Sequence, residues 1–156
     1  MSSDTLNVKD VAAYILSVFD RPISTMKLQK LMYFSQGWAL ALLGRRLVAT
    51  EFQAWKWGPV SYELYGLHRK EYEIREIPEG KPSLVTGNNK VIIDSVINNY
   101  GGLSGMQLGD LTHEADTPWT QVRRAQGITE ERAPSNIKIP DKLISEYFQS
   151  KFEQAQ

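Results

Sequence analysis

Residues 24–43 read S-T-M-K-L-Q-K-L-M-Y-F-S-Q-G-W-A-L-A-L-L, and this stretch decides the fold. Ser24 is a favoured N-cap residue, and Gly44 follows where a left-handed C-cap belongs. The apolar residues between them fall on or near one helical stripe: Met26, Leu28, Leu31, Met32, Trp38, Leu42 and Leu43. The pattern predicts a helix about 30 Å long, which crosses a whole small domain and forms its centre.

Gly37 lies inside this predicted helix, where glycine costs roughly 1 kcal/mol relative to alanine. Because glycine has no side chain, it allows a neighbour to come close to the helix backbone. We therefore expect another element to approach the helix at Gly37, although the sequence does not identify that element.

Beyond Gly44 the apolar period changes from 3.6 to 2, which predicts strands. We expect two short strands, over residues 46–48 and 52–57, with a turn at Thr50. Gly58 then ends the second strand, and Pro59 suits the first turn of the next helix. These residues would form a small two-stranded β-element after the second long helix.

The other predicted helices also have marked ends. Pro22 stops the first of them, Ser104 and Gln107 form a capping box for another, and Pro118 suits a helical first turn. Apart from the central helix, the predicted helices cover about residues 7–19, 59–68, 91–100, 104–113, 118–126 and 140–154. The segment between the third and fourth helices is rich in proline and glycine, which predicts a loop with at most one edge strand.

Length and composition suit one domain with a single core, because the chain has 156 residues and is 42% hydrophobic. We predict a mainly α (α+β) fold: one compact helical domain over residues 1–156, with about six to seven helices and the small β-element. The helix at about residues 140–154 would pack on the rest.

The sequence also bears on the cellular compartment of the protein and on whether it enters a membrane. It has no cysteine, which excludes disulfides and thiolate chemistry and fits a reducing compartment. Its N-terminus lacks the basic and then hydrophobic plan of a signal peptide. The most apolar segment, residues 31–43, is shorter than the about 20 residues of a membrane helix. We predict a soluble, cytoplasmic protein with no membrane partner.

The charges are balanced overall but not along the chain. Residues 1–70 hold nine Lys and Arg against five Asp and Glu, net +4, whereas residues 71–156 hold nine against thirteen, net −4. This asymmetry is compatible either with an ordinary solvated surface or with orientation of a charged partner. No basic run is long enough for an electrostatic footprint on nucleic acid, so nucleic acid is not the predicted partner.

The residues do not suggest an enzyme. His113 is followed closely by Glu114 and Asp116, but neighbours at a helix end point in different directions, whereas zinc needs convergent ligands. A nucleophile elbow and a phosphate-binding loop are also missing from the sequence. We predict no catalytic, metal or cofactor site, and a local structural role for His113 at a helix end.

Trp55 and Trp57 have two interpretations. Each tryptophan removes a large apolar area from water, which usually places it in the core. These two share one predicted strand face with Gln53 and stand beside Lys56 and Tyr62, so they could instead form an exposed patch that anchors a protein partner. The sequence is compatible with both interpretations.

Three segments together resemble the Panacea-domain antitoxin family, which includes SocA-like antitoxins and phage-associated GepA-like proteins. They are K-L-Q-K-L-M-Y-F-S-Q-G-W-A-L-A-L at residues 27–42, F-Q-A-W-K-W-G-P-V-S-Y-E-L-Y at residues 52–65, and L-S-G-M-Q-L-G-D-L-T-H-E-A-D-T-P-W at residues 103–119. Their order and spacing fit, and the resemblance covers about residues 8–125. The family's usual D-P-W ending is interrupted here by Thr117, between Asp116 and Pro118.

The resemblance implies an antitoxin, not an enzyme, that neutralises a cognate protein toxin by direct protein–protein binding.

 The toxin would be encoded beside this chain. One alternative that the resemblance leaves open is a proteolytic adaptor that hands the toxin to a protease. Another, which the positive first half of the chain suggests, is a mobile-element protein that binds nucleic acid or a host factor. The oligomeric state is not predicted.

Two groups of residues are our candidates for function. We predict that the partner-binding group combines an exposed helix face with a pair of aromatic anchors: Lys27, Gln29, Lys30 and Tyr33 for the face, and Trp55 and Trp57 for the anchors. The second group forms a structural motif at turns and helix ends: Gly58, Pro59, His113, Pro118 and Trp119.

Overall fold

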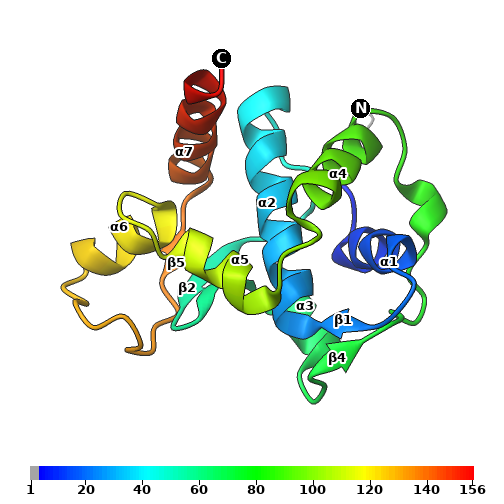
Figure 1. Ribbon diagram of the computed structural model, residues 1–156, viewed down its shortest axis with the longest axis horizontal. Coiled ribbons are helices and arrows are strands. Elements are labelled where there is room, and N and C mark those ends of the chain that lie inside the picture. Colours follow the sequence, from blue (N-terminus) through cyan, green and yellow to red (C-terminus); the bar gives the residue numbers. More distant parts are fainter. Residues whose placement is uncertain (1–3) are drawn as a thin grey trace.

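The computed structural model describes residues 4–156, and in this range the chain forms seven α-helices arranged around α2 (Figure 1). The helices are α1 (Val8–Val18), α2 (Thr25–Leu43), α3 (Tyr62–His68), α4 (Gly87–Tyr100), α5 (Gly105–Thr112), α6 (Pro118–Ala125) and α7 (Asp141–Gln154), with a 3-10 helix η1 (Pro82–Leu84) before α4. The predicted mainly helical α+β fold is confirmed.

The helix ends follow the predicted capping. Ser24 accepts a hydrogen bond from the Lys27 N–H at 3.0 Å, and Gly44 ends α2 with a left-handed φ of 72°. The capping box of Ser104 and Gln107 is present at the start of α5. These are local interactions, so the sequence was sufficient to predict them.

The surroundings of α2 differ from the prediction. Residues 28–37 are buried without a break, so the helix has neighbours on every side and not only along one stripe. Gln29 is 2% exposed, Lys30 1% and Tyr33 2%, and the predicted exposed helix face is therefore wrong. A helical pattern identifies polar residues but does not distinguish those that face water from those that pair with buried backbone.

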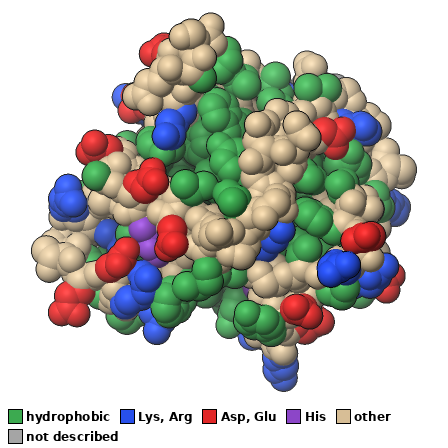
Figure 2. Space-filling view, viewed as in Figure 1, with side chains coloured by type: hydrophobic (Ala, Val, Ile, Leu, Met, Phe, Trp, Pro, Cys, Tyr) green, Lys and Arg blue, Asp and Glu red, His purple; other side chains and the backbone are tan. Residues whose placement is uncertain are grey.

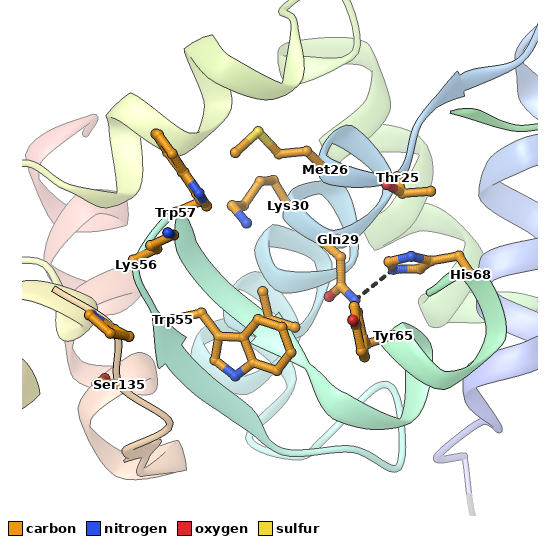
Figure 3. A pocket seen from close by; sticks show the side chains of 12 residues that line it. Thr25, Met26, Gln29, Lys30, Trp55, Lys56, Trp57, Tyr65, His68 and Ser135 are labelled. Carbon is orange, nitrogen blue, oxygen red and sulfur yellow. Dashed lines mark hydrogen bonds between the residues drawn. The ribbon is translucent and has the colours of Figure 1, made fainter. Parts of the chain in front are cut away.

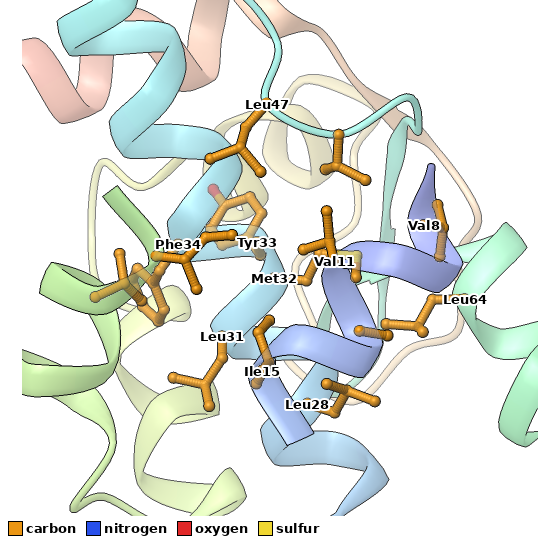
Figure 4. Packing of buried hydrophobic residues seen from close by; sticks show 14 of the residues in the cluster. Val8, Val11, Ile15, Leu28, Leu31, Met32, Tyr33, Phe34, Leu47 and Leu64 are labelled. Atoms are coloured by element: carbon orange, nitrogen blue, oxygen red, sulfur yellow. The ribbon is translucent and has the colours of Figure 1, made fainter. Parts of the chain in front are cut away.

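One side of α2 packs against α1 in an aliphatic layer (Figure 4). Val11 and Ile15 of α1 point toward α2, where Leu28 and Met32 meet them, and all four side chains are fully buried. Leu64 of α3 closes the end of this layer. The periodic apolar residues of the first two helices thus face each other, as amphipathic patterning requires.

The opposite side of α2 packs against α7 through aromatic rings. Tyr33, Phe34 and Trp38 each place a ring edge against Phe148, with centroids 5.1–6.0 Å apart. Gly37 lies under the same ring, and a Cβ there would overlap it. The close approach expected at Gly37 is therefore that of α7.

The main sheet follows α2 in the sequence, but its strands are not where the sequence placed them. Strands β2 (Phe52–Trp55) and β3 (Gly58–Ser61) form an antiparallel hairpin, and β5 (Lys138–Ile139) pairs with the other edge of β2. Gly58 and Pro59 thus begin a strand instead of ending one, and Ser61 caps α3. A second small sheet joins β1 (Ile23–Ser24) to β4 (Glu73–Ile74).

The predicted strand at residues 46–48 is also wrong. Val48 makes only an isolated parallel bridge with Leu6. Its backbone instead pairs with a side chain of α2: Gln36 Oε1 accepts from the N–H groups of Leu47 and Val48 at 2.9 and 3.0 Å, and Gln36 Nε2 donates to the Val48 carbonyl at 3.0 Å. The side-chain amide of Gln36 thus satisfies backbone groups that a neighbouring strand would otherwise pair with. Strand propensity alone does not predict such a contact.

Gln29 makes the same kind of contact two helical turns earlier. Its Oε1 accepts from the Ser61 N–H at 2.8 Å, and its Nε2 donates to the Ser61 carbonyl at 3.1 Å. Gln29 and Gln36 thus hold the segment that leaves β3 and the segment that precedes β2. The hairpin is fixed to α2 at both of its ends.

Replacing Gln36 with leucine should destabilise the fold, because two buried backbone N–H groups would lose their acceptor. We expect the free energy of unfolding to fall by about 2–4 kcal/mol, measured by urea denaturation. Gln149→Leu, at an exposed position of α7, is the matched control and should change stability by less than about 0.5 kcal/mol. Equal effects of the two changes would show that the Gln36 amide does not hold the segment.

Replacing Gly37 with alanine should also destabilise the fold, although alanine is the better helix former. The overlap with Phe148 should outweigh the propensity gain of about 1 kcal/mol and leave a net loss of about 1–2 kcal/mol. Gly66→Ala in α3 is the control, since a Cβ there meets no atom within 4 Å and should stabilise the protein. A Gly37→Ala variant as stable as the Gly66→Ala variant would contradict this packing.

Candidate functional site

The β2–β3 hairpin has a buried face and an outer face. Phe52 and Ala54 point inward and are fully buried, which leaves Gln53 and Trp55 on the other side. Trp55 Nε1 donates to Gln53 Oε1 at 2.7 Å, and the Trp55 ring contacts the Tyr65 ring edge to face with centroids 5.0 Å apart. Because Phe52 and Ala54 occupy the core side, Trp55 is held half-buried beside a cavity.

The turn of this hairpin requires glycine. Gly58 has a φ of 123°, a conformation that residues with a side chain rarely adopt. A Cβ at Gly58 would also lie 2.6 Å from Lys30 Cε, so the turn packs directly on the lysine stem. Trp57, just before this glycine, is left 41% exposed at the tip of the hairpin.

Lys30 is buried beneath the turn. Its ammonium donates to the Pro59 carbonyl at 3.1 Å, and it makes no ion pair with a carboxylate in residues 4–156. Burial disfavours the charged form and lowers the pKa of Lys30 to about 7. The side chain reaches from α2 toward the β2–β3 turn (Figure 3).

These side chains line a cavity of about 320 Å³, which we call the tryptophan pocket (Figure 3). Its lining comes from α2, the hairpin, α3 and the segment before β5: Thr25, Met26, Gln29, Lys30, Trp55, Lys56, Trp57, Val60, Tyr65, His68, Pro134 and Ser135. The walls are mostly apolar and aromatic, with a few polar groups, as in many ligand pockets.

His68 forms the polar end of the tryptophan pocket. Gln29 Nε2 donates to His68 Nε2 at 3.0 Å, which fixes this nitrogen as the acceptor of a neutral ring. Burial lowers the pKa of His68, in agreement with the neutral form. His68 and Tyr65 were missed as site residues, because nothing in their local sequence shows that α3 brings them to Trp55.

A second cavity adjoins the first. It has a volume of about 660 Å³ and shares Thr25, Met26 and Trp57 with the tryptophan pocket. We call it the α2 groove, since it runs past the N-terminus of α2 toward Tyr72 and Met106. Lys27 lines it, donates to the Gly101 carbonyl at 2.6 Å, and is only partly exposed.

A cluster around Trp119 supports the pocket from behind. Trp119 Nε1 donates to the Trp55 carbonyl at 2.6 Å, and Arg123 Nη1 donates to the Ala54 carbonyl at 3.1 Å. The His113 ring stacks on Trp119 at 3.9 Å, and burial lowers the pKa of His113. These contacts fasten α5 and α6 to strand β2, which is a structural arrangement.

The start of α6 explains the interrupted D-P-W pattern. Thr117 is the N-cap and accepts a hydrogen bond from the Thr120 N–H at 3.2 Å, and Pro118 follows at the first helical position as predicted. Asp116 takes a left-handed φ of 71° and its carbonyl accepts from Gln121 at 2.7 Å. The capping role belongs to Thr117.

The structure brings together four of the six predicted partner-binding residues. Gln29, Lys30, Trp55 and Trp57 line the tryptophan pocket, and Lys27 lines the adjoining groove. Tyr33 is not part of either cavity, because it is buried in the aromatic layer against Phe52 and Phe148. Between residues 4 and 156 there is no group of three His, Cys, Asp or Glu side chains that could hold a metal ion.

Within residues 4–156 none of the helices combines the length and the apolar character that crossing a membrane requires.

The buried ammonium of Lys30 should make stability depend on pH. Its pKa is about 7 in the folded state and about 10.5 when unfolded, so the unfolded state binds more protons between these values and stability rises with pH across this window. We expect wild type to gain on the order of 3 kcal/mol relative to Lys30→Met between pH 7 and 10. The measurement is urea denaturation of both proteins. Parallel pH profiles would show that Lys30 keeps its ordinary pKa.

Comparison with known proteins identifies the family. The family model described as "Antitoxin SocA-like, Panacea domain" matches residues 28–120, which include most of α2, the hairpin, α5 and the start of α6. Antitoxin SocA of Caulobacter vibrioides (strain NA1000 / CB15N) is 30% identical over 146 residues, covering 85% of this chain and 75% of that protein. No solved structure shows a significant match. The chain therefore belongs to the SocA-like antitoxin family with a Panacea domain.

Proposed function

We propose that this chain is an antitoxin that neutralises a cognate protein toxin by binding it directly in the cytoplasm, without catalysis. Membership of the SocA-like family and the similarity to an antitoxin support this role. We further propose that the toxin is encoded beside the chain and that it docks over the tryptophan pocket. The pocket is the single observation that carries the choice of surface.

Exposed apolar side chains surround this pocket and favour a protein partner. Trp57, Tyr62, Tyr72 and Met106 are all large, apolar and more than one-third exposed. Trp57, Tyr72 and Met106 line the α2 groove, and Trp57 also lines the pocket. Aromatic residues and methionine are enriched where proteins bind one another, and burying such side chains supplies much of the binding energy.

The site is also rigid enough to bind without folding first. Gln29 ties the end of β3 to α2, Trp119 holds the Trp55 carbonyl, and Tyr65 contacts the Trp55 ring. A side chain that is already fixed loses less conformational entropy when a partner covers it. The hairpin can therefore present Trp55 as an anchor at low entropic cost.

The charge distribution favours a protein over nucleic acid as the partner. The formal net charge is zero, and acidic and basic side chains are interspersed on the face shown in Figure 2. Nucleic-acid binding by phosphate contacts usually needs clustered lysine and arginine.

The test is co-expression of the chain with the product of the adjacent gene. We expect the toxin to stop growth alone, the chain to restore growth, and the double variant Trp55→Ala, Trp57→Ala to lose restoration while keeping its helical circular dichroism. Binding of the purified pair should weaken by about 100-fold or more, since each anchor contributes more than about 1–2 kcal/mol.

The matched control is Leu42→Ala, Val91→Ala, which removes two exposed apolar side chains that line neither cavity. This control should still restore growth and bind the toxin. A folded tryptophan variant that rescues growth fully would exclude the pocket as the docking site. Failure of the wild-type chain to bind any adjacent product would contradict neutralisation by direct binding.

A further inference from the structure

The tryptophan pocket combines apolar walls with a cationic rim. The Lys56 ammonium lies 5.9 Å from the centroid of the Trp57 ring, and the Arg132 guanidinium lies 4.3 Å from the same centroid. Across the pocket, the Arg69 guanidinium lies 5.7 Å from the centroid of the Tyr65 ring. Three exposed cations thus stand over the aromatic residues that form the walls.

Glu131 and Glu71 lie near this rim, but neither of them lines the pocket. The charged residues that line the pocket are Lys30 and Lys56, and the lining includes no carboxylate. In the described part of the chain neither Lys56 nor Arg69 takes part in an ion pair, whereas Arg132 is 3.6 Å from Glu131. The mouth of the pocket is therefore complementary to negative charge.

Lys30 adds an unused donor in the wall of the pocket. An ammonium group has three N–H donors, and the Pro59 carbonyl at 3.1 Å is the acceptor that the structure provides within residues 4–156. Burying a cation costs free energy unless the cation is paired. An anionic acceptor on a ligand would therefore form a charge-assisted hydrogen bond with Lys30 and stabilise the complex. The same acceptor would favour the charged form of Lys30.

Resting on the antitoxin function proposed above, we propose that the tryptophan pocket receives one large apolar side chain of the toxin, whose flanking carboxylates pair with Lys56, Arg69 and Lys30. The occupant is thus a short segment that carries an apolar anchor between acidic residues. Apolar contact supplies affinity, and the charges select the segment and speed its association.

The dimensions fit such a segment. A volume of about 320 Å³ is at the lower end of ligand pockets and suits one side chain rather than a whole helix face. The α2 groove continues from the pocket past Met26, so the polypeptide on one side of the anchor has a path along the surface. A free amino acid would leave this groove empty.

The groove also argues against a nucleic acid as occupant. Aromatic rings beneath cations can stack bases, and the pocket alone would be compatible with that role. The α2 groove, however, is lined by two cations and two carboxylates, Arg21, Lys27, Asp20 and Glu73, so it offers no net positive charge to a continuing phosphate backbone. A segment whose carboxylates flank the anchor needs cations only at the mouth of the pocket.

Blocked synthetic peptides test the proposal on the full-length chain. The probe is Gly-Glu-Phe-Asp-Gly, compared with Gly-Gln-Phe-Asn-Gly and Gly-Glu-Ala-Asp-Gly, and binding is followed by tryptophan fluorescence. We expect the first peptide to bind at least tenfold more tightly than either of the others, and Lys30→Met to reduce its advantage over the neutral peptide. Equal binding of the neutral peptide, no saturable binding of the first, or tighter binding of oligothymidylate would each overturn the proposal.

The toxin provides the second test. Lys56→Glu, Arg69→Glu should weaken toxin binding at least tenfold and slow association, whereas Lys142→Glu, Lys151→Glu on α7 should not. The control reverses the same number of exposed cations, and Lys151 also lies over a ring, 5.8 Å from the Tyr147 centroid. Toxin binding that is lost in the tryptophan variant but kept in the Lys56, Arg69 variant would overturn the acidic segment while leaving the antitoxin function in place.

Discussion

The side-chain amides of two glutamines on α2 are the constraint on which the rest of the structure depends. Gln36 pairs with the backbone of Leu47 and Val48, and Gln29 pairs with Ser61, so both ends of the hairpin region are tied to one rigid helix. Buried backbone groups must find partners, and here no strand is available to supply them. The central helix therefore carries polar residues in its most buried stretch.

The tryptophan pocket is a consequence of this attachment. With the hairpin fixed on α2, Phe52 and Ala54 fill the core side, and Trp55 is left on the outer side. Gly58 lets the turn settle on the Lys30 stem, which buries an ammonium without a carboxylate partner. The site thus combines aromatic walls with the ammonium of Lys30, which has no carboxylate partner. Such a combination suits binding, whereas burying an unpaired ammonium costs folding stability.

How much of the site could be predicted depends on the range of the interactions. The local alternation with Phe52 and Ala54 predicts that Trp55 and Trp57 share the other face of the strand, but it does not decide between the core and an exposed patch; the structure leaves Trp55 half-buried and Trp57 41% exposed. The prediction of Lys30 and Gln29 depends on an exposed helix face and is wrong in that respect, because both line the pocket from buried positions. Tyr65 and His68 were missed, because only the packing of α3 beside the hairpin brings them there.

The sequence by itself determined the helices, their caps, the close approach at Gly37 and the family, since each of these depends on short-range patterns or on recognisable motifs. The tertiary structure decided which polar residues of α2 are buried, where the strands begin, and which side chains surround the pocket. The physical reason is that the neighbours in sequence are the same whether such a side chain is buried or exposed. Gln36, which pairs with backbone in place of a strand, and Lys30, which is buried under the Gly58 turn, have the same helical pattern as a glutamine and a lysine in water. Only the neighbours that fold against it set its hydrogen bonds and its charge.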